Sequence, residues 1–599
     1  MKFLLVAVNA KYIHSNLAVY CLKSYAASKG YGVELVEYTI NQQPGEVLRD
    51  LYEKKADVVA FSCYIWNMEF VKAVLKDYKK ICPQSELWLG GPEVSYRAEA
   101  LLGEMPEVRG IMTGEGEETF AKLCATYENQ SVEMAGSKKM PPNYGFLSDI
   151  PGIVVRGTDG EIFVTGPAAA LDFSRLPFPY GDGSVTVDKH IQNGEALWNT
   201  TMSDFDNRII YYESSRGCPF SCAYCLSSLD KKVRFRDMEL VKRELRFFLD
   251  KQVPQVKFID RTFNINNART MELLAFIKEN DNGITNFHFE VAAELLTEEQ
   301  IDILNSLRPG LVQLEIGVQS TNQETLSAVN RRTRLGELRE KVAAVRKNNN
   351  VHIHLDLIAG LPKEDLDSFK NSFNEVYRMN PHQLQLGFLK VLSGAPMEQM
   401  ATENEIAYQS APPYEVLSTK WLSYADIILL KKVEELVEVY YNSGQFVYSM
   451  MYLQHFFETP FELFEELAAF YEKNCFVGMK LSRNRRYEIL LEFVEQRIGT
   501  TESVRVFEEL LFFDYCLREK PKGRLSLGME RQLAKQELRE AYEAFGIKRE
   551  EEGMRDVERF SFDPVETAER GNASGEPSYI LFDYACREPM YGQAVFVVS

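Results

Sequence analysis

The chain has 599 residues, of which 45% are hydrophobic and 26% are charged. This balance is typical of globular proteins and excludes collagen-like, low-complexity and wholly disordered chains; the length predicts roughly two to four domains. Acidic residues outnumber basic ones by 87 to 68, so the formal net charge is -19. Such a charge disfavours nucleic acid and anionic membranes as partners, unless a local basic patch overrides it.

Apart from Lys2, the first eight residues are apolar and look like the start of a signal peptide. Asn9, Lys11 and His14 interrupt the run, and no small-residue cleavage site follows, so we expect a short buried strand. No segment approaches the roughly 18 apolar residues that a membrane span requires. Ten cysteines are too few for a disulfide scaffold in a chain of this length. These features predict a soluble protein of a reducing compartment, the cytoplasm.

Residues 1–125 alternate between short apolar runs and segments of helical spacing. The predicted strands are 3–8, 32–38, 57–63, 86–89 and 108–112, and the predicted helices include 17–27, 68–81 and 118–127. This alternation predicts α/β architecture with a doubly wound, Rossmann-like parallel sheet. Ligands of such sheets lie at the carboxyl ends of the strands. The candidate binding turns are therefore 9–16, 62–67, 90–95 and 113–118.

Residues 136–205 are predicted to be a connector. Pro141-Pro142-Asn143 breaks any regular element, and residues 153–156 and 161–165 flank Gly157-Thr158-Asp159-Gly160, which is a hairpin signal. The proline-rich stretch 176–180 then predicts an extended chain.

Residues 206–405 carry a second series of alternating elements. The predicted strands are 209–213, 256–260, 287–291, 311–318, 351–357 and 383–391. Six repeats predict a partial (β/α)6 TIM-like barrel, with its chemistry at the carboxyl ends of the strands. Residues 406–599 are predicted to be mostly helical, with helices at 422–439, 461–473 and 486–497, a loop at 551–577 and terminal strands at 579–584 and 594–598. A short echo, 513–519 against 582–588, predicts two paired edges.

Three cysteines, Cys218, Cys222 and Cys225, lie at C-x3-C-x2-C spacing directly after a predicted strand. Three thiolates on one tight loop can ligate three irons of a cubane and leave the fourth iron open to a small molecule. A closed zinc site would need a fourth ligand, and no nearby Cys or His supplies it. Because the other seven cysteines are scattered along the chain, the spacing favours a cluster over chance.

This loop, with Tyr224 before its last cysteine, resembles that of radical S-adenosylmethionine (SAM) enzymes. Segments 314–320 and 356–362 look like that family's fourth- and fifth-strand signatures, and 258–264 resembles the second strand of one subgroup. The resemblance implies a 4Fe-4S cluster held by the three cysteines. It also implies SAM bound to the open iron and reductive cleavage to a 5'-deoxyadenosyl radical.

Weaker candidates lie at other strand ends. Gln319 and Ser320 end a strand on the active face and are candidate contacts to SAM or substrate, with strand-end capping as the alternative. Glu290 and Glu294 lie four residues apart and are predicted on one face of the third strand, where Glu294 is the candidate cofactor contact. His352, His354 and Asp356 could form a metal site; we favour the polar, cavity-facing half of a strand.

The N-terminal turns with Gly90-Gly91 and Gly114-Glu115-Gly116 resemble those of the cobalamin-binding domain that precedes many radical SAM barrels. Glycines would let the backbone approach a flat corrinoid closely, and Ser62 begins the candidate turn 62–67 at the same edge. The histidine motif D-x-H-x-x-G is absent, so we expect no histidine ligand from it. A degenerate domain without cofactor is the alternative. A dinucleotide site is not supported, because the first turn lacks G-x-G-x-x-G.

The resemblance predicts a cobalamin-binding domain (1–135), the connector with its β-hairpin (136–205), a radical SAM domain (206–405) and a mostly helical domain of unknown role (406–599). The predicted cofactors are a 4Fe-4S cluster, SAM and cobalamin, and the predicted reaction is methyl transfer to an unactivated centre. Cyclisation or rearrangement, RNA methylthiotransfer and a non-catalytic sensor are the alternatives. The expected partners are a small-molecule or peptide substrate, rather than nucleic acid or a membrane, and an electron donor such as flavodoxin or ferredoxin.

Overall fold

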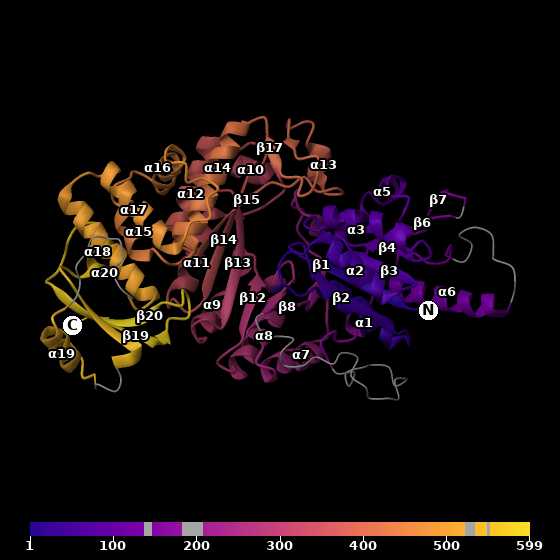
Figure 1. Ribbon diagram of the computed structural model, residues 1–599, viewed down its shortest axis with the longest axis horizontal. Coiled ribbons are helices and arrows are strands. Elements are labelled where there is room, and N and C mark those ends of the chain that lie inside the picture. The colour runs from indigo at the N-terminus through magenta and orange to yellow at the C-terminus, as the bar shows by residue number, and fades with distance from the viewer. Residues whose placement is uncertain (137–146, 158, 182–207, 522–532, 548–551, 599) are drawn as a thin grey trace. The chain divides into compact units, whose positions relative to one another are not determined.

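The computed structural model describes residues 1–136, 147–157, 159–181, 208–521, 533–547 and 552–598. The predicted break at 141–143 lies outside these ranges. The chain forms two compact units, coloured by residue number in Figure 1. The first contains Met1–Ile303, Val329–Arg331 and Leu389–Val416, and the second contains Leu304–Ala328, Arg332–Phe388 and Leu417–Ser599.

The first unit begins with a parallel sheet. Its strands are β1 (Phe3–Asn9), β2 (Val33–Thr39), β3 (Val58–Ser62), β4 (Glu86–Gly90) and β5 (Gly110–Met112), in the order β2-β1-β3-β4-β5. Every residue of β1 is buried, in keeping with its apolar run from Phe3 to Val8. The order confirms the predicted doubly wound sheet and places its switch point between β1 and β3.

Helices cover this sheet (Figure 1). Helix α1 (Leu17–Ser28) packs on α6 (Gly116–Gly136), and α2 (Pro44–Lys54) packs on α3 (Met68–Ile81). Helix α3 has the predicted bounds, because Met68, Val71, Val74, Leu75 and Tyr78 recur at helical spacing and join the core of the sheet. The predicted hairpin, β6 (Ile153–Arg156) with β7 (Ile162–Val164), pairs antiparallel with β5 and extends the sheet to seven strands.

The central parallel sheet contains the six predicted strands, and they follow one another in chain order. Strands β8 (Ile209–Tyr212), β11 (Gln255–Phe258) and β12 (Asn286–Glu290) belong to the first unit; β13 (Val312–Gln319), β14 (His352–Ala359) and β15 (Gln383–Phe388) belong to the second. Helices α7 (Met238–Asp250) and α8 (Asn267–Glu279) separate the strands of the first group, and α11 (Leu335–Arg346) and α12 (Leu366–Arg378) those of the second.

The C-terminal region is mostly helical, as predicted, with α14 (Tyr424–Val437), α15 (Val447–Gln454), α16 (Pro460–Lys473), α17 (Arg483–Arg497) and α18 (Thr501–Arg518). It also has an antiparallel sheet of β18 (Arg555–Phe560), β19 (Ser578–Arg587) and β20 (Ala594–Val598). The loop predicted at 551–577 is wrong, because β18 and α20 (Pro564–Arg570) lie in it. Asp563 caps that helix and Pro564 is its first residue, a position that proline favours.

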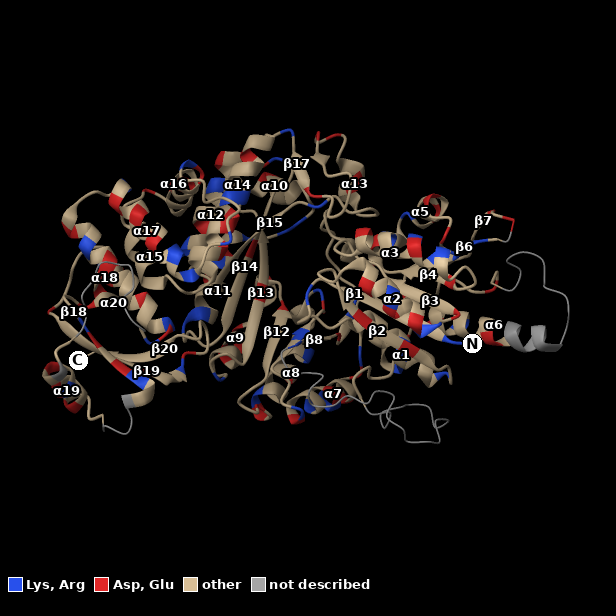
Figure 2. Cartoon of the chain, in the orientation of Figure 1, with Lys and Arg blue, Asp and Glu red and all other residues tan. Residues whose placement is uncertain are grey.

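The predicted pairing of the two echoed segments is also wrong. Residues 513–518 lie in α18 and 582–587 in β19. The two segments share a hydrophobic core, in which Phe513 and Cys516 follow a helical period while Phe582 and Tyr584 alternate along a strand. No helix in the described part of the chain is long and apolar enough to cross a membrane. Figure 2 shows basic and acidic residues scattered together over the helices.

Candidate functional site

The three cysteines lie on a loop that a short ribbon closes at its base. Strand β9 (Ser215–Arg216) pairs antiparallel with β10 (Arg234–Phe235), so residues 217–233 leave and return to the same point. Gly217 has a φ of 102°, and a Cβ there would lie 2.4 Å from the Lys232 carbonyl oxygen. Only glycine allows this closure.

Asp260, just beyond β11, anchors the segment that leads into the loop. Its buried carboxylate accepts hydrogen bonds from the Ser214 amide (2.7 Å) and from the hydroxyls of Ser214 and Ser215 (both 2.6 Å). Burial raises the pKa of Asp260, and these hydrogen bonds oppose that shift. In the sequence, the segment that contains Asp260 stands out only for its resemblance to a family strand. The anchoring contacts of Asp260 were not predicted.

The three cysteine side chains of the loop are the candidate ligands of the cubane. Cys218 and Cys222 are buried, Cys225 is half-buried, and all three are free thiols. Among the described residues, no group of three or more His, Cys, Asp or Glu is arranged to hold one metal ion. A cubane does not require such convergence, because each thiolate binds a different iron.

Arg331 lies beside these ligands, although the sequence did not single it out. Its Nη1 donates to Cys222 Sγ at 3.8 Å. Burial raises the pKa of the neighbouring Tyr224, and the Cys222 thiol acts in the same direction while Arg331 opposes it. A guanidinium so close to a ligand sulfur would stabilise the thiolate.

Glu294 and Gln319 have buried oxygens with unused hydrogen-bonding capacity. Glu294 lies in a 3-10 turn (Ala293–Leu295) after β12, so it does not share a strand face with Glu290, contrary to the prediction. Its Oε2 atom has no hydrogen-bond partner among the described residues. In the second unit, Gln319 ends β13 with a φ of 71°, and its Oε1 is likewise buried without a partner there. Such atoms fit a polar ligand.

The Ser320 hydroxyl forms hydrogen bonds with neighbouring protein groups. Its hydroxyl donates to Glu364 Oε1 at 2.6 Å and accepts from the Asn322 amide at 3.0 Å, which is the capping alternative. The Ser372 hydroxyl also donates to Glu364, at 3.0 Å. Burial raises the pKa of Glu364 to about 7, and the two serines oppose that shift.

The histidines of β14 contact other residues of the second unit. His354 Nε2 lies 3.0 Å from Asp356 Oδ1, and the ring of His352 stacks on His382 at 5.0 Å.

The switch point of the N-terminal sheet is held by a network of amides. Asn16 Nδ2 donates to Ser62 Oγ (3.2 Å) and Asn9 Oδ1 (3.3 Å), and Asn67 Nδ2 donates to the carbonyl oxygens of Val8 and Ser62 (both 2.9 Å). The turns after β1 and β3 are thereby fixed to each other, and the Ser62 hydroxyl lies inside this network.

The glycines of the N-terminal turns have different surroundings. Gly91 has a φ of 115°, and a Cβ there would lie 2.5 Å from the Cys63 carbonyl oxygen, so the turns after β3 and β4 touch. Gly90 ends β4, and Gly116 begins α6. A Cβ on Gly114 would meet no atom within 4 Å. Tyr12, Trp66 and Tyr96, on the same set of turns, are 44–66% exposed. Open backbone beside exposed aromatic rings fits a flat, largely apolar cofactor such as a corrinoid.

Glu115, predicted as a cofactor contact, forms ion pairs with two arginines. Its carboxylate accepts from Arg234 Nη1 at 3.1 Å and from the Leu171 amide at 3.2 Å, and Arg216 Nη1 lies 3.6 Å away.

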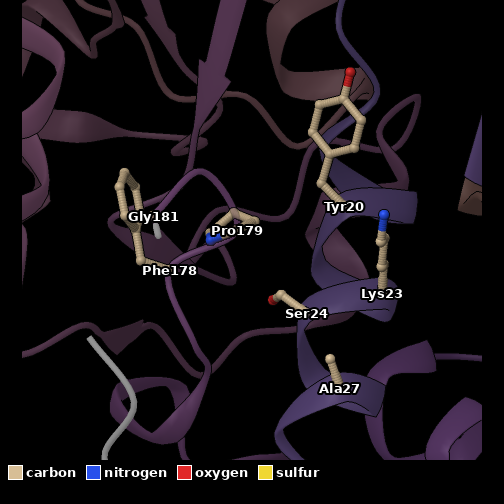
Figure 3. Close-up of a pocket in the computed structure, with 7 residues that line it drawn as sticks. All are labelled: Tyr20, Lys23, Ser24, Ala27, Phe178, Pro179 and Gly181. Atoms are coloured by element: carbon tan, nitrogen blue, oxygen red, sulfur yellow. The ribbon is translucent and has the colours of Figure 1, made fainter. Parts of the chain in front are cut away.

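A small pocket lies between α1 and residues 178–181 (Figure 3). It is lined by Tyr20, Lys23, Ser24, Ala27, Phe178, Pro179 and Gly181. None of the predicted cofactor residues lines it.

Three family models match consecutive parts of the chain. A "B12 binding domain" model matches residues 4–124, a "Radical SAM superfamily" model matches 212–376, and a "Protein of unknown function (DUF4080)" model matches 402–582. The last covers the region in which we found no sequence motif.

Curated relatives and solved structures agree with these matches. The chain is 27% identical over 382 residues to the cobalamin-dependent radical SAM methyltransferase TokK of Streptomyces tokunonensis, covering 59% of this chain and 50% of TokK. It is 26% identical to a 2-(S-pantetheinyl)-carbapenam-3-carboxylate methyltransferase of Streptantibioticus cattleyicolor, covering 57% and 48%. The chain thus spans about half the length of these relatives.

Among solved structures, the fold resembles that of the cobalamin-dependent S-adenosylmethionine radical enzyme OxsB with aqua-cobalamin bound. The TM-score is 0.55 at 15% identity, over 86% of this chain and 80% of OxsB. A cobalamin-type sheet followed by a radical SAM sheet with its three-cysteine loop is thus established in sequence and in fold. The chain thus joins a domain that matches the B12-binding model to a domain that matches the radical SAM model, in that order along the sequence.

Proposed function

We propose that this chain is a cobalamin-dependent radical SAM methyltransferase that acts on an unactivated carbon or phosphorus centre of a small-molecule or peptide substrate. One observation carries the proposal. A single compact unit contains both the ribbon-closed cysteine loop and the carboxyl edge of a B12-type sheet. The names of the relatives, two of which are methyltransferases, support it.

The residues divide the work as follows. When bound, the cluster with SAM supplies the radical and cobalamin supplies the methyl group. Cys218, Cys222 and Cys225 would hold the cluster. Glu294 and Gln319 would accept hydrogen bonds from amino or hydroxyl groups of SAM or substrate, because their buried oxygens have no partner among the described residues.

The chemistry also implies a partner and a compartment. Reductive cleavage of SAM consumes one electron, for which we propose a flavodoxin or ferredoxin as donor. A cubane with an open iron survives only where oxygen is scarce or the surroundings are reducing, and we therefore propose the cytoplasm.

The proposal is tested on the full chain, reconstituted anaerobically with iron, sulfide and hydroxocobalamin. We expect the wild type to show cluster absorption, to retain corrinoid through gel filtration and to release 5'-deoxyadenosine from SAM with dithionite. Replacing Cys218, Cys222 and Cys225 by Ala should abolish the cluster signal and the 5'-deoxyadenosine, but not corrinoid retention. Cys475→Ala and Cys586→Ala, at exposed cysteines, are matched controls that should behave as wild type.

Each negative result has a separate meaning. An intact cluster signal in the triple variant would refute the ligand assignment. Complete loss of corrinoid from the wild type would refute the cobalamin role. An intact cluster that does not cleave SAM would favour a sensor.

A further inference from the structure

Buried ion pairs join the base of the cysteine loop to the turn after β5. Arg216, at the start of the loop, lies 2.8 Å from Glu213 and 2.9 Å from Glu117 (Nη2 to carboxylate oxygen in both cases). Its Nη1 atom lies 3.6 Å from Glu115. Glu115 and Glu117 belong to the turn that carries Gly114 and Gly116, so one guanidinium bridges two segments with different predicted cofactors.

The other strand of the ribbon makes a second bridge to the same turn. Arg234 pairs with Arg216 across β9 and β10, and it donates to Glu115 Oε2 at 3.1 Å and to the Leu171 carbonyl at 3.2 Å. Both ends of the cysteine loop are therefore tied to Glu115.

These contacts are shielded from solvent. The side chains of Arg216, Glu117 and Glu213 are 19%, 6% and 15% exposed, and the Arg216 guanidinium lies over the Phe173 ring at 5.1 Å. Exposed ion pairs contribute little free energy to the folded state. Breaking a buried pair is costly, because it leaves an unpaired charge in a poorly solvated place. The planar guanidinium also fixes direction, which a lysine would not do.

We propose that Arg216 is a positioning residue that sets the separation between the corrinoid turn and the cluster loop. The inference rests on the proposed function. Arg216 precedes Cys218 by two residues, while its partners Glu115 and Glu117 flank Gly116. A group passed between two cofactors and a substrate requires their spacing to be held closely, because small misplacements cost large factors in rate.

The test measures that separation in the full chain, loaded with hydroxocobalamin and a reconstituted cluster and reduced with dithionite. Pulsed EPR reports how much the reduced cluster accelerates relaxation of the cob(II)alamin spin, and this effect depends steeply on distance. We expect one fast relaxation phase in the wild type and its loss, in favour of slower and dispersed relaxation, in Arg216→Gln. Arg216→Lys should fall between the two.

Two further variants complete the design. Glu117→Gln removes one partner and leaves the Arg216–Glu213 pair, so it serves if Arg216→Gln fails to fold; we expect the same dispersion. Arg485→Gln breaks a more exposed pair away from the cysteine loop, Arg485 with Glu492 in α17 (side chains 35% and 39% exposed), and should relax as wild type.

The outcomes separate this inference from the proposed function. Identical relaxation in wild type, Arg216→Gln and Glu117→Gln, with both cofactors bound, would overturn the positioning role alone. Variants that lose iron or cobalt, while the chains that remain loaded relax as wild type, would assign the ion pairs to stability only and also overturn it. A wild type that retains no corrinoid would overturn the proposed function itself.

Discussion

Glu364 is a buried carboxyl group whose protonation the fold controls. It is fully buried after β14, where two serine hydroxyls donate to Oε1 while Oε2 has no partner in the described part of the chain. Burial moves its pKa from 4.5 to about 7. Between these two values the folded chain keeps a proton that the unfolded chain releases. The contribution of Glu364 to stability is therefore lost as the pH rises through about 7.

Glu364→Gln should remove this pH dependence, because the amide keeps an oxygen for both serines and does not ionise. We expect thermal unfolding midpoints measured at about pH 6 and about pH 8 to differ less in the variant than in the wild type, with the variant more stable at the higher pH. Glu403→Gln, at an exposed carboxylate, is the control and should keep the wild-type profile. An unchanged profile in Glu364→Gln would mean that Glu364 ionises normally.

At the scale of elements, the ribbon-closed loop depends on one glycine. Gly217→Ala places a methyl group 2.4 Å from the Lys232 carbonyl oxygen at a φ of 102°, and strain of this kind costs on the order of 1–3 kcal/mol. We expect the variant to fold but to hold less iron per chain after reconstitution. Gly336→Ala lies in α11 with open space around it and should hold iron as wild type does. Wild-type iron content in Gly217→Ala would show that the loop does not need this closure.

Most helices and strands were predictable, because the spacing of apolar residues and the length of each apolar segment specify them. The fully buried β1 and the amphipathic α3 follow directly from their apolar spacing. The prediction failed where one sequence suits two structures, as in Phe-Asp-Tyr of α18 and of β19. It also failed at 551–577, predicted as a loop, where Asp563 caps a helix that begins at Pro564. Among site residues, Cys218 and its partners follow from spacing, whereas Arg331 and Asp260 act through contacts with residues far away in sequence, which no local pattern encodes.

For the whole molecule, the charge of -19 predicts how the chain behaves toward RNA. Basic residues are interspersed with acidic ones on the helices shown in Figure 2. We therefore expect no saturable binding of fluorescent single-stranded RNA at about 0.15 M salt and about 10 µM protein, measured by anisotropy. Affinity in that range that weakens steeply with added salt would contradict this expectation and revive the RNA methylthiotransferase alternative.

The division of the chain into interleaved units bears on its biosynthesis. The first unit takes Val329–Arg331 and Leu389–Val416 from beyond its main stretch. These late segments supply the Val329 carbonyl that accepts from the Ala223 amide, and the Met397 amide that donates to the Ala223 carbonyl. A ribosome that has translated only the first 303 residues has therefore not yet delivered the surroundings of the cysteine loop. The loop can have all of these contacts only after the chain has emerged past residue 397, and we therefore expect cluster insertion late in translation or after it.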